Sequence, residues 1–345
     1  MSGTLVRVIV EAGIKIALFL VVMLTAIAYM TWLERKVCAW IQDRRGPNRV
    51  GFMGLLQPLA DGIKFLTKEP SLPPHVFTPI FILAPAILFI PAMVTFSVVP
   101  FGPVLRVFGL TIPLQIANVD NGILIVLAFA SMGVYGVALA GWSSNNKYSL
   151  MGGLRSSAQL ISYELAMGIA IVGVLMTTGS LRLGDVVEHQ MAHGWNILWQ
   201  FPGFLIFLTA AFAETNRAPF DLPEAETELV AGYHTEYSGM WFSLFMMAEY
   251  GNMITASALV VTLYLGGYHV PGLRLLGLPE PAAALLQVLA FSLKVAFFLF
   301  LYIWVRWTVP RFRYDQLMNL GWKVLLPIGL IQILWVALVI LRGWA

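Results

Sequence analysis

Residues 12–33, AGIKIALFLVVMLTAIAYMTWL, decide the fold, because they form an apolar run that carries only one charge, Lys15. About 20 predominantly apolar residues are needed to cross a bilayer as a helix. Backbone N–H and C=O groups cannot remain unpaired in lipid, so such a run must be helical. It is too long for the apolar part of a secretory signal, and no small-x-small cleavage site closes it. We therefore expect a retained membrane span.

Seven further apolar runs follow this one along the chain. The whole sequence is 59% hydrophobic and 11% charged, with a mean hydropathy of +0.80, whereas about a quarter of a soluble chain is charged. The longest remaining segment, 34–77, is below the usual floor of about 50 residues for a domain. The sequence predicts an all-α polytopic membrane protein with a single membrane domain over 1–345. The eight expected transmembrane helices lie at about 12–33, 78–100, 122–142, 158–178, 199–214, 239–265, 284–306 and 322–342.

Several classes of site are excluded by the residues that are absent from the sequence. Cys38 is the only cysteine, which excludes an internal disulfide and a cysteine-only metal or iron–sulfur site. The five histidines form no HExxH pattern, and His189 and His193, although spaced i,i+4, have no acid between them. Neither a Walker loop nor a GxGxxG motif occurs. We expect this chain to bind no metal, no redox cofactor and no nucleic acid.

The distribution of basic residues predicts the orientation in the membrane. An even number of spans places both termini on one side and the segments 34–77, 143–157, 215–238 and 307–321 on the other. Fourteen Lys and Arg residues fall on or beside this second side, against six on the side of the termini. Positive charge favours the cytoplasm. We therefore expect these segments in the cytoplasm, or in the matrix for an organelle, and both termini on the opposite side of the membrane.

The first cytoplasmic segment combines a basic stretch with an amphipathic one. The stretch 33–51, LERKVCAWIQDRRGPNRVG, is followed by 54–69, GLLQPLADGIKFLTKE. Leu55, Leu59, Ile63 and Leu66 share a helical face, which predicts a helix lying in the membrane interface. Two interpretations remain open for the arginines, an anchor for anionic lipid headgroups and a docking shelf or cavity rim.

The segment 214–237, ETNRAPFDLPEAETELVAGYHTEY, holds six of the eighteen carboxylates. It lies between two apolar runs, where acids are costly and therefore indicate function. Leu222-Pro223-Glu224 is typical of a helix start. Glu224 and Glu228 would then share a face and titrate as a coupled set, while Glu226 points away. A solvated acidic loop is the alternative interpretation.

Three further charges fall inside predicted spans, namely Glu164, Glu249 and Lys294. A charged residue at a span centre costs about 2.5–3.5 kcal/mol on insertion scales, so each should face the protein interior or water. Glu214, Glu236 and Glu249 would step from the cytoplasmic rim into the membrane, which favours a polar path. The alternative is a neutralising pair of Lys294 with Glu249 or Glu164.

Three long motifs carry a family resemblance. The first loop (34–36, 44–51 and 54–69), the segment 152–168, GGLRSSAQLISYELAMG, and the segment 213–239, AETNRAPFDLPEAETELVAGYHTEYSG, resemble the H subunit of the proton-pumping NADH:quinone oxidoreductase. The mitochondrial counterpart is subunit 1 of respiratory complex I. The resemblance implies a bacterial inner-membrane protein with its termini on the periplasmic side, or a mitochondrial inner-membrane protein if the source is organellar. The likeness spans nearly the whole chain, with the motifs in the expected order.

The resemblance implies a subunit of a translocating enzyme whose NADH-oxidising centre lies elsewhere. Partner subunits carry the FMN and iron–sulfur clusters, and quinone is the substrate. The implied partners are the subunit with the terminal [4Fe–4S] cluster, the large subunit of the quinone pocket, the small A, J and K membrane subunits, and membrane lipid.

The resemblance also implies roles for particular residues of this sequence. The spans would form a quinone access tunnel, and a glutamate-lined path would couple quinone reduction to proton translocation. That path corresponds to Glu164, Glu214, Glu224, Glu226, Glu228, Glu236 and Glu249, and the quinone tunnel or docking surface to Arg35, Arg44, Arg45, Arg49, Asp61 and Lys64.

Two rival functions use the same features. A heel subunit of a membrane-bound hydrogenase complex would need no quinone tunnel, and a stand-alone ion or proton transporter would work without partner subunits. A purely structural anchor is a third alternative.

Overall fold

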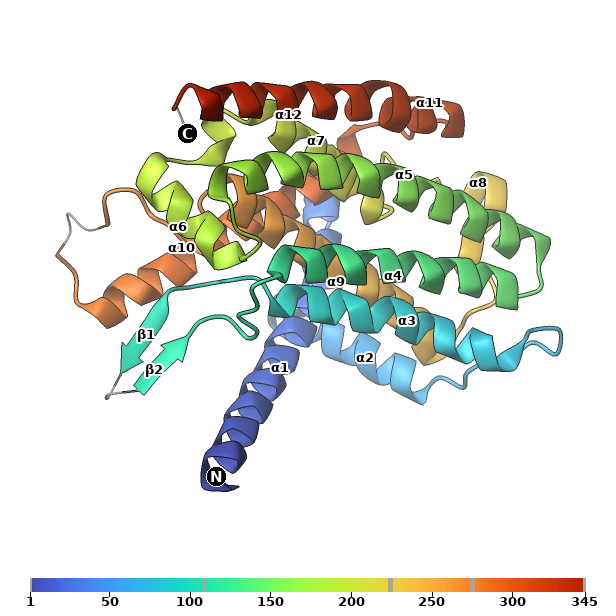
Figure 1. Ribbon diagram of the computed structural model, residues 1–345. Helices are drawn as coiled ribbons and strands as arrows, with labels where there is room; N and C mark the ends of the chain where they lie inside the picture. Colours follow the sequence, from blue (N-terminus) through green and yellow to red (C-terminus); the bar gives the residue numbers. More distant parts are fainter. Residues whose placement is uncertain (1, 108–109, 223–225, 274–276, 344–345) are drawn as a thin grey trace.

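The computed structural model describes residues 2–107, 110–222, 226–273 and 277–343, and it is helical over most of this length (Figure 1). Within the described ranges, seven helices are long and apolar enough to cross a membrane. The predicted all-α polytopic class is therefore confirmed. These helices are α1 (Ser2–Ile41), α3 (Thr78–Ser97), α4 (Gly122–Ser143), α5 (Lys147–Thr178), α9 (Gly239–Tyr264), α10 (Glu280–Thr308) and the continuous segment Tyr314–Leu341.

The fifth predicted span corresponds to a short helix, α7 (Phe201–Glu214). Its 14 residues rise only about 21 Å, which is less than the roughly 30 Å of a hydrocarbon core. Between Glu214 and Gly239 the described residues are irregular except for α8 (Glu226–Leu229) and a 3₁₀ turn at Gly232–His234. Irregular backbone is tolerated at membrane depth only where protein buries it, and Thr215–Arg217 is buried.

The end of α7 is closed by an amide from α5. The Gln159 side-chain nitrogen lies 2.8 Å from the Ala213 carbonyl and 2.9 Å from the Phe220 carbonyl. The last carbonyls of a helix lack intrahelical partners, so Gln159 supplies donors that water cannot supply at this depth. No pattern in the sequence identified this residue.

Close backbone contacts hold the bundle together at glycines. A Cβ on Gly141 in α4 would lie 2.6 Å from the Ser149 carbonyl oxygen of α5. A Cβ on Gly152 in α5 would lie 2.6 Å from the Gly232 Cα in the loop before α9. Small residues let membrane helices approach closely, and here they bring the acidic loop against α5.

The elements not yet described are a hairpin, several short helical segments and the parts of the last spanning segment. Strands β1 (Val104–Val107) and β2 (Leu110–Pro113) pair antiparallel, with Val104 opposite Pro113. No sequence motif predicted this hairpin. The other elements are a 3₁₀ turn at Phe52–Gly54, α2 (Gln57–Thr67), α6 (Leu183–His193), a 3₁₀ turn at Asn196–Leu198, α11 (Tyr314–Asn319), a π-helical stretch Leu320–Leu325 and α12 (Leu326–Leu341).

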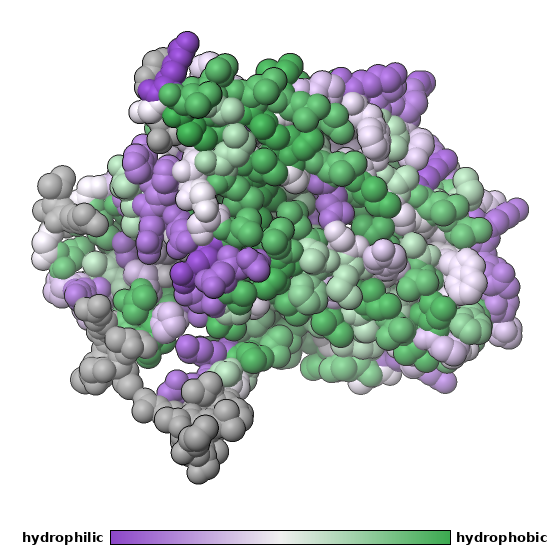
Figure 2. All heavy atoms as spheres, viewed as in Figure 1, coloured by the Kyte–Doolittle hydropathy of each residue, from purple (hydrophilic) through white to green (hydrophobic). Residues whose placement is uncertain are grey.

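Helix α2 is the predicted amphipathic helix, although it begins later than expected. Leu59, Ile63 and Leu66 are exposed on it. Leu55 belongs to the preceding turn and not to the helix, because Phe52–Gly54 forms a separate 3₁₀ turn. On the face seen in Figure 2, hydrophobic residues cover much of the middle, with hydrophilic residues gathered towards the ends.

Candidate functional site

Arg217, in the irregular loop after α7, is the centre of a buried charged cluster. Its guanidinium nitrogens lie 3.5 Å from Glu34 Oε1 in α1 and 3.8 Å from Glu249 Oε2 in α9. The guanidinium also stacks over the Tyr250 ring, 4.4 Å from its centroid. Since these side chains are about 10% exposed or less, the ion pairs are poorly screened and one arginine joins α1 to α9.

Glu34 gathers further partners at the end of the predicted first span. It accepts a hydrogen bond from the Tyr250 hydroxyl at 2.7 Å and another from Arg306 of α10. Glu34 was not among the residues selected from the sequence. At the end of the predicted span a carboxylate would oppose the helix macrodipole. This unfavourable position was the one feature of the sequence that could have pointed to Glu34. In the structure α1 continues to Ile41, so Glu34 lies within the helix.

The electrostatics of the loop follow from this burial. Burial lowers the pKa of Arg217, but Tyr250, Glu34 and Glu249 outweigh it, and the pKa is raised overall. Burial lowers the pKa of His234 against the opposing effect of Glu249. Arg217 is therefore a permanent cation, whereas His234 is held towards its neutral form.

Glu249 lies near the middle of α9, on the side of the helix that meets this cluster. Its Oε1 accepts a hydrogen bond from the Tyr233 hydroxyl at 3.0 Å. Tyr233 is fully buried, and the close approach of Gly152 to Gly232 places its backbone against α5. Glu249, predicted from its position inside a span, thus lies in the charged cluster.

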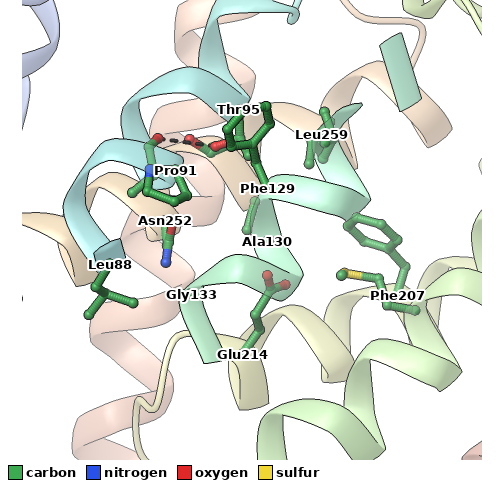
Figure 3. A pocket seen from close by; sticks show the side chains of 15 residues that line it. Leu88, Pro91, Thr95, Phe129, Ala130, Gly133, Phe207, Glu214, Asn252 and Leu259 are labelled. Carbon is green, nitrogen blue, oxygen red and sulfur yellow. Dashed lines mark hydrogen bonds between the residues drawn. The ribbon is translucent and has the colours of Figure 1, made fainter. Parts of the chain in front are cut away.

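Two small cavities lie beside Glu214, and one of them also reaches Glu249. One, of about 20 Å³, is lined by both carboxylates together with Asn216, Tyr233 and Asn252. The second, of about 30 Å³, is lined by Glu214, Asn252, Thr95 and Thr255 among apolar side chains. Figure 3 shows the Glu214 carboxyl and the Asn252 amide at this second cavity. A cavity of about 10–15 Å³ can hold one water when polar partners are present. Each cavity therefore has room for water, and in the first one that water would lie between the two acids.

Glu164 extends the set of acids on α5. It accepts a hydrogen bond from Ser131 of α4, and its charge interacts with that of Glu214. The structure thus brings Glu164, Glu214 and Glu249 together, from three different helices.

The other predicted acids lie at the rim or outside the described residues. Glu228 is 55% exposed and pairs with Arg155 at 2.6 Å. Glu236 is 19% exposed, accepts from Asn146 at 2.7 Å and lies 3.8 Å from His75. Glu224 lies outside the described residues, and for Glu226 only its backbone, at the start of α8, is described. The shared face expected for Glu224 and Glu228 therefore stays a prediction.

The residues predicted for the quinone tunnel or docking surface lie on the surface of this chain. Arg35 binds Asp61 at 2.7 Å, which ties α1 to α2, and Lys64 lies 3.8 Å from the same carboxylate. Arg44 bonds Gln42. Arg45 and Arg49 are exposed and make no side-chain hydrogen bond or ion pair with the described residues.

Lys294 does not form the acid pair considered as an alternative. Its ammonium donates to the carbonyls of Leu265, Gly267 and His269 at 2.8–3.0 Å, and it lies 4.7 Å from the centre of the Trp195 ring. Three backbone carbonyl dipoles at and just after the end of α9 thus stabilise the ammonium, and no carboxylate of the described residues is bonded to it. The pairing of Lys294 with Glu249 or Glu164 is therefore wrong.

An apolar groove of about 610 Å³ runs along α1 beside α10. Its lining extends on α1 from Lys15 to Leu33, with Phe291 and Val295 of α10 on the other wall. That length of helix rises about 27 Å, close to the thickness of a hydrocarbon core. The groove therefore offers an apolar slot that ends one residue before Glu34.

The fold and the site define a polytopic membrane protein with a buried acid–base cluster. Among the described residues, no three or more His, Cys, Asp or Glu side chains gather to hold a metal. The groups that the cluster itself brings together are an arginine, carboxyl groups and a tyrosine hydroxyl.

Comparison with known proteins places the chain more narrowly. A family model described as NADH dehydrogenase matches residues 14–337. An NADH-quinone oxidoreductase H subunit of Koribacter versatilis is 52% identical, over 97% of this chain and 98% of the relative. The H subunit of the same enzyme from Leptospira biflexa is 52% identical over 96% of both chains. The H subunit from Geobacter sulfurreducens is 50% identical over 100% of this chain and 98% of the relative. The chain belongs to the family of NADH-quinone oxidoreductase H subunits, and it is a membrane subunit of that enzyme complex, complex I.

Proposed function

We propose that this subunit forms the quinone access path of the complex and a glutamate-lined path that couples quinone reduction to proton translocation. The observation that carries the proposal is the buried cluster of Arg217 with Glu34 and Glu249, continued through a small cavity to Glu214. Reduction of a quinone takes up protons and changes the charge at its head group. A coupled set of acids beside an arginine can respond to that change.

The groove between α1 and α10 supports the part of the proposal that concerns quinone entry. An isoprenoid tail needs an apolar slot open to lipid, and the groove has that character over about the depth of the membrane. It ends beside Glu34, so a tail within it would point its head towards the charged cluster.

The acids have an ordered arrangement that suits a relay. Glu249 contacts the cluster, Glu214 shares both cavities with Asn252, and Glu164 follows on α5. Moving one charge across about 100 mV costs roughly 2.3 kcal/mol, which the coupling must supply for each proton.

The remaining parts of the proposal concern the membrane domain and its partners. The chain is one membrane domain with its termini on the periplasmic side of a bacterial inner membrane, and 34–77 and 215–238 face the cytoplasm. Partner subunits dock on that face and carry the FMN and the iron–sulfur clusters, including the terminal [4Fe–4S] cluster, and the small A, J and K membrane subunits pack beside the spans. Quinone is the substrate, and this chain binds none of the redox cofactors.

Replacing Glu214 with Gln tests the coupling path, since Gln keeps the side-chain shape but removes the ionisable group. We expect normal assembly, normal NADH oxidation with a hydrophilic electron acceptor, and much reduced NADH:quinone activity and proton pumping in liposomes. Thr209→Ser, on the exposed side of α7, is the matched control. Unchanged quinone activity and pumping in Glu214→Gln would rule out this acid as part of the path.

Reversing the charge of Arg35 and Arg45 tests the surface around α2. We expect a weaker complex or a raised KM for quinone, because Arg35 fixes α2 through Asp61 and Arg45 is exposed for a partner. Assembly and KM equal to wild type would leave only the lipid-anchor interpretation.

A further inference from the structure

Helix α6 lies at the end of the membrane domain opposite the acidic loop (Figure 1). Its Gln190 donates to the Thr262 carbonyl at 2.8 Å and accepts from the Gly266 N–H at 2.9 Å, at the C-terminal end of α9. The 26 residues of α9 rise about 39 Å and begin just after the acidic loop. Side chains on α6 are therefore remote from the candidate coupling site.

Two histidines stand on successive turns of this short helix. The His189 and His193 rings are stacked, with centroids 4.4 Å apart and ring planes inclined by 22°. His193 is exposed and His189 is half-buried. Residues spaced i,i+4 share a helix face, so the two imidazoles open to the same surface.

Hydrogen bonding and burial determine which nitrogen of each ring keeps an accessible lone pair. His193 Nδ1 lies 3.2 Å from the His189 carbonyl oxygen. That carbonyl can only accept, so Nδ1 carries the proton and Nε2 keeps its lone pair. His189 Nδ1 is buried without a hydrogen-bond partner in the described structure, which leaves Nε2 as its accessible nitrogen.

We propose that His189 and His193 bind a transition-metal ion such as Cu²⁺ or Zn²⁺ through their two Nε2 atoms. Imidazole is a preferred ligand of these ions. Metal-bound histidines usually donate their other N–H to a carbonyl or carboxylate, which His193 already does. A rotation of the His189 ring about χ2, a soft torsion for histidine, would bring its Nε2 lone pair towards the ion, while the His193 ring keeps its hydrogen bond to the carbonyl.

The site is an open clamp with two protein ligands. No third His, Cys, Asp or Glu joins them in the described residues, so solvent completes the coordination. An ion bound there joins two successive turns of the helix that carries Gln190, and it stabilises the contact of α6 with the end of α9.

Copper titration of the purified full-length chain tests the proposal. The protein is prepared in detergent without a polyhistidine tag, treated with chelator and titrated with Cu²⁺ by calorimetry and electron paramagnetic resonance. We expect one Cu²⁺ whose spectrum shows coupling to two imidazole nitrogens. His189→Gln or His193→Gln should each remove one nitrogen and weaken binding roughly 10²-fold, since the second ligand of a chelate acts at high effective concentration.

His75→Gln is the matched control, because His75 is also an exposed histidine but lies beside Glu236 near the acidic loop. It should leave affinity and spectrum unchanged. The proposal is overturned if the His189 and His193 variants bind Cu²⁺ as wild type does. A measurement on the unaltered protein is independent of these variants: Zn²⁺ should protect both rings from diethyl pyrocarbonate, and equal modification with and without Zn²⁺ would also overturn it.

Discussion

The two halves of α9 stabilise buried polar groups in different ways. In the N-terminal half, Glu249 faces Arg217 and Tyr233, and charge balances charge. At the C-terminal end, Gln190 and the ammonium of Lys294 donate to backbone carbonyls. In the first arrangement carboxylates meet an arginine, whereas in the second an amide and an ammonium donate to carbonyls at and just after the end of the helix. Burial of a charge therefore does not by itself mark the coupling path.

The largest expected effect comes from replacing Arg217 with Gln. Glu34 and Glu249 would lose their shared counter-charge, and breaking a buried ion pair from one side costs about 3–5 kcal/mol. We expect little assembled complex on native gels and a lowered midpoint of thermal unfolding. Arg311→Gln is the control, because Arg311 is 39% exposed in its pair with Asp221 and should change both measurements little. Wild-type assembly of Arg217→Gln would refute the central place of this ion pair.

Replacing Lys294 with Met sharpens the contrast at the other end of α9. It leaves three carbonyls without their donor. Each carbonyl that water cannot reach lowers the free energy of unfolding by about 1–3 kcal/mol. We expect a lower unfolding midpoint in detergent but unchanged NADH:quinone activity per assembled complex. Lys294→Arg, which keeps the charge and the donors, should recover much of the midpoint. If Lys294→Met lowered activity and pumping at normal stability, the two halves of α9 would not differ in function.

Replacing Glu228 with Gln should have the smallest effect. Its pair with Arg155 is solvent-exposed, and such pairs contribute about 0–1 kcal/mol. We expect stability within error of wild type and a smaller loss of proton pumping than in Glu214→Gln. Pumping measured side by side in liposomes decides this, and an equal or greater loss in Glu228→Gln would extend the path to the rim.

Much of the site was predictable because charges inside apolar runs are conspicuous. Glu164 and Glu249 were identified from their position in spans, and Glu214 from its place at the end of one. Glu34 and Gln159 were missed. Glu34 lies at the end of an apolar run beside basic residues, and a buried glutamine resembles any other polar residue in a helix. Only their partners, Arg306 in one case and the carbonyls around the end of α7 in the other, identify them.

The sequence by itself determined, except at the short α7, which segments form helices long and apolar enough to cross a membrane, and it determined where the acids concentrate. Apolar length and local charge are properties of neighbouring residues. Only the tertiary structure decided which charges meet. Glu34 and Arg306 are 272 residues apart in the chain, and their contact depends on how α1 and α10 pack. It also decided that Lys294 is satisfied by carbonyls and Arg217 by carboxylates, because the partner of a buried charge is whatever group the packing brings within a few ångströms.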